Sequence, residues 1–113
     1  MQWRKIEMQK DILSIAQDAV LQAARIEKEY FLKHKSEQKS EVITAKRMIS
    51  HIAYNYAVDP AVIGDFFNKH RTSIYYYIKS CQDFIDTDKI FAVIYADALT
   101  EFKKKLAKMI DNR

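Results

Sequence analysis

The sequence contains only one glycine, one proline and one cysteine in 113 residues. Sheet proteins need turn residues about every 8–12 positions, so this scarcity excludes a hairpin-rich fold and predicts long helices joined by few tight turns. A single cysteine cannot form an internal disulfide and is typical of a reducing compartment. A single glycine also cannot build the glycine-rich loop that cradles phosphates in nucleotide-hydrolysing proteins.

Long uncharged apolar runs are missing as well. Charged residues from Arg4 to Asp11 interrupt the start of the chain, which excludes the apolar core of a signal peptide. No other stretch approaches the ~18 apolar residues of a membrane span. With 49% hydrophobic and 30% charged residues, the sequence is typical of a folded soluble protein. We expect one all-α domain over residues 1–113, in the cytoplasm and without membrane contact.

Catalytic and metal-binding patterns are not found. The three histidines, His34, His51 and His70, lie far apart and lack cysteine or acidic partners at ligand spacing. Cys81 falls on a predicted apolar helix face, where a core role is expected. We therefore expect no enzyme, no cofactor, no metal and no small-molecule substrate.

The first third of the chain has the periodicity of one long helix over residues ~3–34. Two interpretations remain open for this 1–34 segment: a helix packed on its own domain, or an N-terminal arm through which two copies form a homodimer. Its apolar stripe comprises Met8, Ile12, Ile15, Ala19, Ile26 and Tyr30, widened by Leu13, Ala16, Val20, Ala23 and Ala24.

A polar loop at 34–40 separates this helix from four more. Apolar spacing places them at ~41–57, ~60–67, ~70–86 and ~88–110. Asp59 is a good N-cap, Pro60 suits the first helical position, and Asn68 tolerates the left-handed conformation that ends a helix. The predicted buried rows of the last two helices are Ile74, Tyr77, Ile78, Cys81 and Ile85, then Phe91, Ile94, Ala98, Phe102 and Leu106. We thus expect a helix-turn-helix core at 40–86 and a long C-terminal helix at 87–113.

Charge is distributed in blocks. Residues 33–47 and 68–82 each carry a net charge of +3, whereas residues 83–102 carry −4. The segment 68–80 contains Lys69, Arg71 and Lys79 and no carboxylate. Since a helix N-terminus already presents N–H donors and a positive dipole end, cations and hydroxyls there favour phosphate and base contacts. The segment therefore predicts a DNA recognition helix.

Two motifs support this prediction. Residues 63–67 (IGDFF) followed by 69–74 (KHRTSI), with Lys79 five places on, resemble the C-terminal DNA-binding domain of the bacterial replication initiator DnaA. Residues 45–49 (AKRMI) are similar to the segment that precedes the helix-turn-helix in that family. The resemblance covers roughly residues 40–85. It implies an all-α, Trp-repressor-like fold whose recognition helix reads the major groove, with a basic loop in the minor groove.

The sequence departs from this family in three respects. His70-Arg71 stands where the family has Asp-His, and because Arg can bind guanine bidentately, the family's DNA box is not inherited. The family's ATPase has no counterpart, and the long N-terminal helix stands where the ATPase would connect. We therefore expect a stand-alone DNA-binding module.

The leading hypothesis is a sequence-preferring binder of double-stranded DNA, associated with the nucleoid. It would act as a transcription regulator or replication accessory factor of a bacterium, phage or mobile element. The alternative is a helical protein-interaction module that has lost DNA binding and docks a partner through its acidic 83–101 face or its N-terminal stripe. The candidate DNA contacts are Lys69, His70, Arg71, Thr72, Ser73, Tyr76, Lys79, Lys46, Arg47, Lys39 and Lys35.

Overall fold

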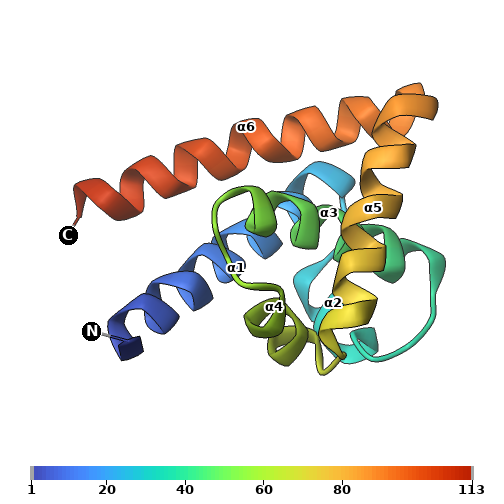
Figure 1. Cartoon of the computed structure of the whole chain (residues 1–113). Coiled ribbons are helices and arrows are strands. Elements are labelled where there is room, and N and C mark those ends of the chain that lie inside the picture. The colour runs from blue at the N-terminus through green and yellow to red at the C-terminus, as the bar shows by residue number, and fades with distance from the viewer. Residues whose placement is uncertain (1, 113) are drawn as a thin grey trace.

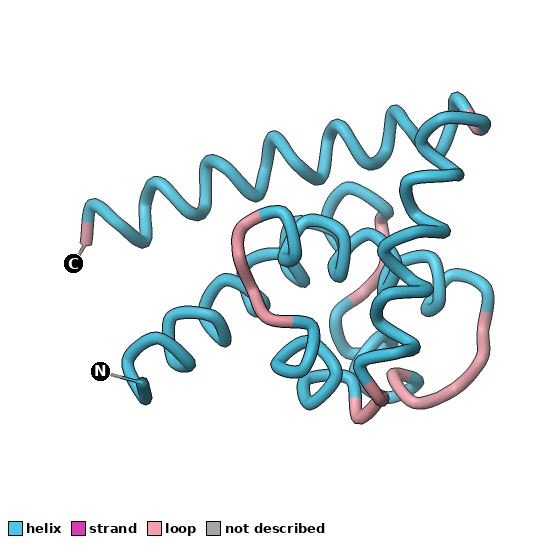
Figure 2. Tube along the Cα trace, in the orientation of Figure 1, coloured by secondary structure: helices cyan, strands magenta, loops and turns pink. Residues whose placement is uncertain are grey.

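The computed structural model describes the backbone of residues 2–112 and the side chains of residues 5–112. Its regular elements are all helices, and no strand occurs in the described backbone, which confirms the all-α prediction (Figures 1 and 2). The helices are α1 (Gln2–Ala24), α2 (Lys28–His34), α3 (Ser40–Asn55), α4 (Pro60–Phe67), α5 (Arg71–Thr87) and α6 (Lys89–Asp111). None of them is long and apolar enough to cross a bilayer.

The two longest helices, α1 and α6, run side by side in opposite directions, so both ends of the chain lie at the same side of the molecule (Figure 1). Helix α3 packs between α1 and α5 and supplies the centre of the core. Its Ala45, Met48, Ile49, Ile52 and Ala53 have no exposed surface, as their helical spacing predicts.

The prediction of one helix over residues ~3–34 is wrong, because the chain turns after Ala24. Arg25 adopts the left-handed conformation at φ 57°, and the Ile26 N–H donates to the Leu21 carbonyl at 2.9 Å, which closes α1. Helix α2 then takes a new direction that buries Phe31 completely. No glycine or proline marks this break, so burial of Phe31 outweighs the cost of a left-handed arginine.

Helix α1 packs against α6, α3 and α4 of the same chain, which favours the interpretation that it belongs to its own domain. The buried face of α1 is centred on other residues than the apolar stripe that the sequence predicts. Leu13, Ala16 and Val20 are fully buried, whereas Met8 is 48% exposed. This face of α1 is therefore occupied within the chain.

Helix α4 has the predicted bounds, and its signals act as expected. The Asp59 carboxylate accepts the Ala61 N–H at 2.8 Å, Pro60 occupies the first turn, and Asn68 ends the helix at φ 55°, ψ 49°. Gly64 is required by close approach, because a Cβ there would lie 2.5 Å from the Lys69 carbonyl oxygen. The Lys69 N–H donates to the Gly64 carbonyl at 2.8 Å, so the turn is held against the helix.

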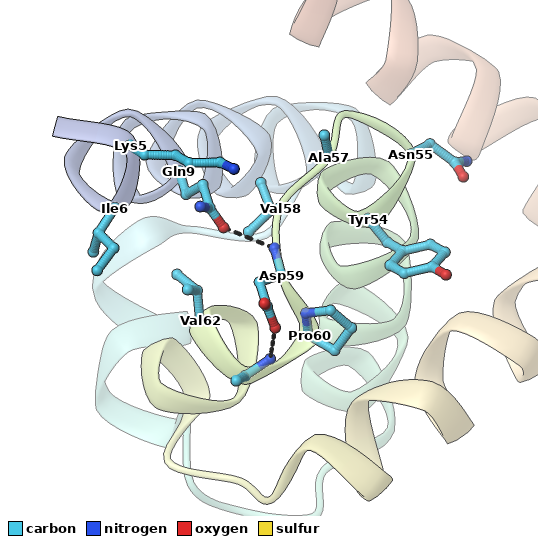
Figure 3. A pocket seen from close by; sticks show the side chains of 11 residues that line it. Lys5, Ile6, Gln9, Tyr54, Asn55, Ala57, Val58, Asp59, Pro60 and Val62 are labelled. Carbon is cyan, nitrogen blue, oxygen red and sulfur yellow. Dashed lines mark hydrogen bonds between the residues drawn. The ribbon is translucent and has the colours of Figure 1, made fainter. Parts of the chain in front are cut away.

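The entry into α4 is also fixed from α1. The Asp59 N–H donates to the Gln9 side-chain oxygen at 2.7 Å, as Figure 3 shows. The two residues line an open hollow of about 730 Å³ between α1 and the α3–α4 connection. The helix pair α4–α5 is thereby oriented relative to the long helices.

The buried row of α6 contains Phe91, Ala98 and Phe102 as predicted, but Tyr95 replaces Ile94 as a buried member. The reason is a polar contact: the Tyr95 hydroxyl lies 2.6 Å from His51 Nδ1 on α3, and the two rings meet edge to face. His51 Nε2 lies 2.9 Å from the side-chain oxygen of Gln82 on α5. This hydrogen-bonded link joins α3, α5 and α6, and burial raises the pKa of the Tyr95 phenol.

Candidate nucleic-acid interface

The turn between α4 and α5 ends in a histidine cap. His70 has extended backbone angles, and its Nδ1 accepts the Thr72 N–H at 3.1 Å, with the Thr72 hydroxyl 2.9 Å away. The side chain satisfies one of the unpaired N–H groups at the start of α5. Helix α5 therefore begins at Arg71, one residue later than the sequence predicts.

Several predicted contact residues gather at this end of α5. Arg71 and Thr72 are exposed, and Ser73 and Lys69 are half-buried. Tyr76 and Lys79 continue the exposed face of α5 at helical spacing from Thr72, and Tyr76 is 58% exposed. The opposite face carries the buried Ile74, Tyr77 and Cys81, as predicted. The turn and the first three turns of α5 thus form one polar surface.

The two loop lysines lie in different surroundings. Lys35 follows α2, and its Nζ lies 4.1 Å from the ring centroid of Phe66, so it sits beside the end of α4. Lys39 lies over the Tyr30 ring at 5.5 Å, near the carboxylate of Glu41. The hydrogen bond from Tyr30, with a smaller effect of Lys39, lowers the pKa of Glu41. Only Lys35 joins the surface at the turn.

Lys46 and Arg47, both candidate DNA contacts, lie in different surroundings. Lys46 has no exposed surface, and its Nζ lies 6.0 Å from the Phe67 ring centroid. Arg47 instead places its guanidinium carbon 5.2 Å from the centroid of the Phe84 ring. Arg47 thus lies beside the part of α5 that carries Tyr77, Cys81 and Phe84, beyond the first turn of the helix. The side chains diverge because neighbouring helix positions point about 100° apart.

The described residues hold no group of three His, Cys, Asp or Glu side chains that could share a metal ion. Cys81 lies in the core, where burial raises the pKa of its thiol to about 12. The thiol is thus kept protonated at neutral pH.

No family model, curated protein or solved structure matches the chain.

Proposed function

We propose that the protein binds double-stranded DNA with sequence preference, with the start of α5 in the major groove. The observation that carries the proposal is the surface formed by the turn and α5. Arg71 and Lys79 are exposed there, Lys69 is half-buried, and none of the three is paired with a carboxylate among the described side chains. Cations on phosphates would supply affinity, and Arg71, Thr72 and Ser73 would supply specificity.

The helix pair supports this role by its dimensions. Helix α4 is short, the turn contains three residues, and α5 presents its N-terminal residues beyond the turn, which are features of helix-turn-helix proteins. We infer that the pair is a Trp-repressor-like helix-turn-helix and that the likeness to the DnaA domain reflects a shared mode of binding. A role as regulator or replication accessory factor, in a nucleoid-associated protein, follows from that proposal.

The test is selection from a random-sequence duplex library at low and moderate salt. We expect enrichment of a preferred site and affinity that falls steeply with salt. In the Arg71→Ala variant, discrimination between sites falls, because a bidentate arginine–guanine pair contributes about 1–3 kcal/mol. In the Lys79→Ala variant, all sequences bind more weakly while site preference is kept. Absence of binding at low salt would refute the proposal.

A protein-interaction module remains the second candidate, and the start of α6 favours it. Ile90 is 75% exposed and Val93 is 61% exposed, beside the acidic residues Asp86 and Asp97. Exposed apolar side chains within a charged rim are typical of docking surfaces. This candidate predicts a protein complex that survives Arg71→Ala and is lost on Ile90→Ser. A homodimer through α1 would have to use exposed residues such as Met8, and light scattering on the full chain tests it.

A further inference from the structure

Lys46 is the most unusual charged residue of the described structure. Its side chain has no exposed surface, and its Nζ has no hydrogen-bond partner among the described residues. A buried ammonium normally has a carboxylate, several hydrogen bonds or an ion beside it, because loss of its hydration is costly. Lys46 is therefore a buried cation on α3 that no described residue hydrogen-bonds.

Two further lysines lie near Lys46, one in the loop after α2 and one in the turn between α4 and α5. The Nζ atoms of Lys35 and Lys46 lie 5.5 and 6.0 Å from the ring centroid of Phe67, so one aromatic ring adjoins both ammonium groups. Lys69, in the turn, is close enough that its charge acts on Lys46. Burial, followed by the charges of Lys69 and Lys35, lowers the pKa of Lys46.

No carboxylate offsets these charges. None of the three ammonium groups lies within 4.0 Å of a carboxylate oxygen of the described side chains. Lys35 and Lys69 are only half-buried, so both side chains are partly open to solvent, whereas Lys46 is enclosed. An anion there would remove the mutual repulsion of three cations and replace lost hydration.

We propose that Lys35, Lys46 and Lys69 form a binding site for a single phosphate group. Ammonium groups are compact point charges with several donors, and they suit the oxygens of a phosphate. The phosphate can belong to a DNA backbone, in which case the inference rests on the proposed function, or it can be a free phosphate. In the DNA complex the site would hold one backbone phosphate beside the turn and thereby fix the register of α5.

A purely structural role does not explain Lys46. A cation–π contact needs the ammonium within about 6 Å of the ring, and Lys46 lies at that limit while Lys35 lies closer to Phe66 and Phe67. A methionine would fill the same volume without a buried charge. Replacement of Lys46 should therefore stabilise the free protein while it weakens the site.

The first arm of the test uses inorganic phosphate alone. We expect sodium phosphate to raise the Tm of the wild-type protein relative to sodium chloride at equal ionic strength, because a ligand stabilises the state that binds it. Lys46→Met should raise the Tm without phosphate and abolish the phosphate-dependent increase. The matched control is Lys103→Met, which removes one exposed charge from α6 and should keep the increase. An equal phosphate response in wild type and Lys46→Met would overturn the site.

The second arm measures binding to the duplex library as a function of salt. Lys46→Met should weaken binding about tenfold on every sequence, and the slope of log affinity against log salt should fall by about one. A lost phosphate response with unchanged DNA affinity assigns the site to free phosphate. If the wild-type protein binds no duplex, the proposed function fails, and the phosphate arm still decides the site.

Further variants keep the test decisive if Lys46→Met does not fold. Lys35→Met and Lys69→Met change half-buried side chains, and each should reduce the phosphate response. If phosphate raises the Tm of both variants as much as that of the wild type, the proposal is overturned.

Discussion

Gly64→Ala tests whether the turn and α4 are as tightly joined as their geometry indicates. The added Cβ would lie 2.5 Å from the Lys69 carbonyl oxygen, and ordinary contact begins near 3.4 Å, so the turn must move by about 0.9 Å. Overpacking of this kind costs about 1–3 kcal/mol. Loss of the hydrogen bond from the Lys69 N–H to the Gly64 carbonyl adds about 1 kcal/mol. The higher helix propensity of alanine returns about 1 kcal/mol.

The net expectation is a free energy of unfolding lower by about 1–3 kcal/mol, with a Tm lower by about 5–15 °C. Urea unfolding followed by circular dichroism measures it. The matched control is Asp65→Ala, which changes the next, exposed position of the same helix and gains helix propensity without a clash. DNA affinity should fall in Gly64→Ala, because Lys69 and His70 move with the turn. A variant as stable as the wild type would refute the close approach of α4 and the turn.

Three other experiments, two substitutions and one labelling measurement, test single features of the structure. Lys46→Met should raise the free energy of unfolding by about 1–3 kcal/mol at neutral pH, because it removes a buried cation without a hydrogen-bond partner. Folding lowers the pKa of Lys46, so the folded protein releases this proton at a lower pH than the unfolded chain does. The difference in free energy of unfolding between Lys46→Met and the wild type should therefore shrink as pH rises toward about 10.5. Urea unfolding across this pH range measures the difference. Cys81 is fully buried, and burial raises the pKa of its thiol to about 12, so a thiol reagent at pH 8 should label it only after the protein opens. Rapid labelling of the native protein would contradict its placement. Arg25→Gly should raise the Tm slightly, because the left-handed conformation at φ 57° costs a non-glycine residue about 1 kcal/mol. A lower Tm would show that the arginine side chain stabilises the fold by more than its backbone conformation costs.

The elements with local signals were predicted closely. Asp59, Pro60 and Asn68 act through their own backbone and neighbours, so the bounds of α4 could be inferred without knowledge of the fold. The end of α1 could not be inferred in this way. Arg25 is not a typical turn residue. The break between α1 and α2 accompanies the burial of Phe31 in the core, which is a tertiary contact.

The same difference separates the predicted site residues. Residues 69–73 are adjacent in sequence, so their gathering at one turn follows from local structure alone. The burial of Lys46 depends on where α4 places Phe67, which is a tertiary event. The link of His51 to Tyr95 was missed, although a histidine among the apolar positions of α3 is a signal for a buried polar contact.

The cap at His70 determines which hydrogen bonds the rest of its ring can make. A backbone N–H can only donate, so Nδ1 of His70 carries no proton, and the neutral ring keeps its proton on Nε2. The remaining nitrogen is therefore a hydrogen-bond donor, suited to guanine O6 and N7 or to a phosphate oxygen. In the DnaA motif an aspartate stands at this position, and a carboxylate can cap the helix equally well but only accepts. In the proposed DNA complex, histidine would keep the helix start and would favour acceptor-rich base edges, whereas the aspartate of the DnaA motif would favour the exocyclic amines of adenine and cytosine.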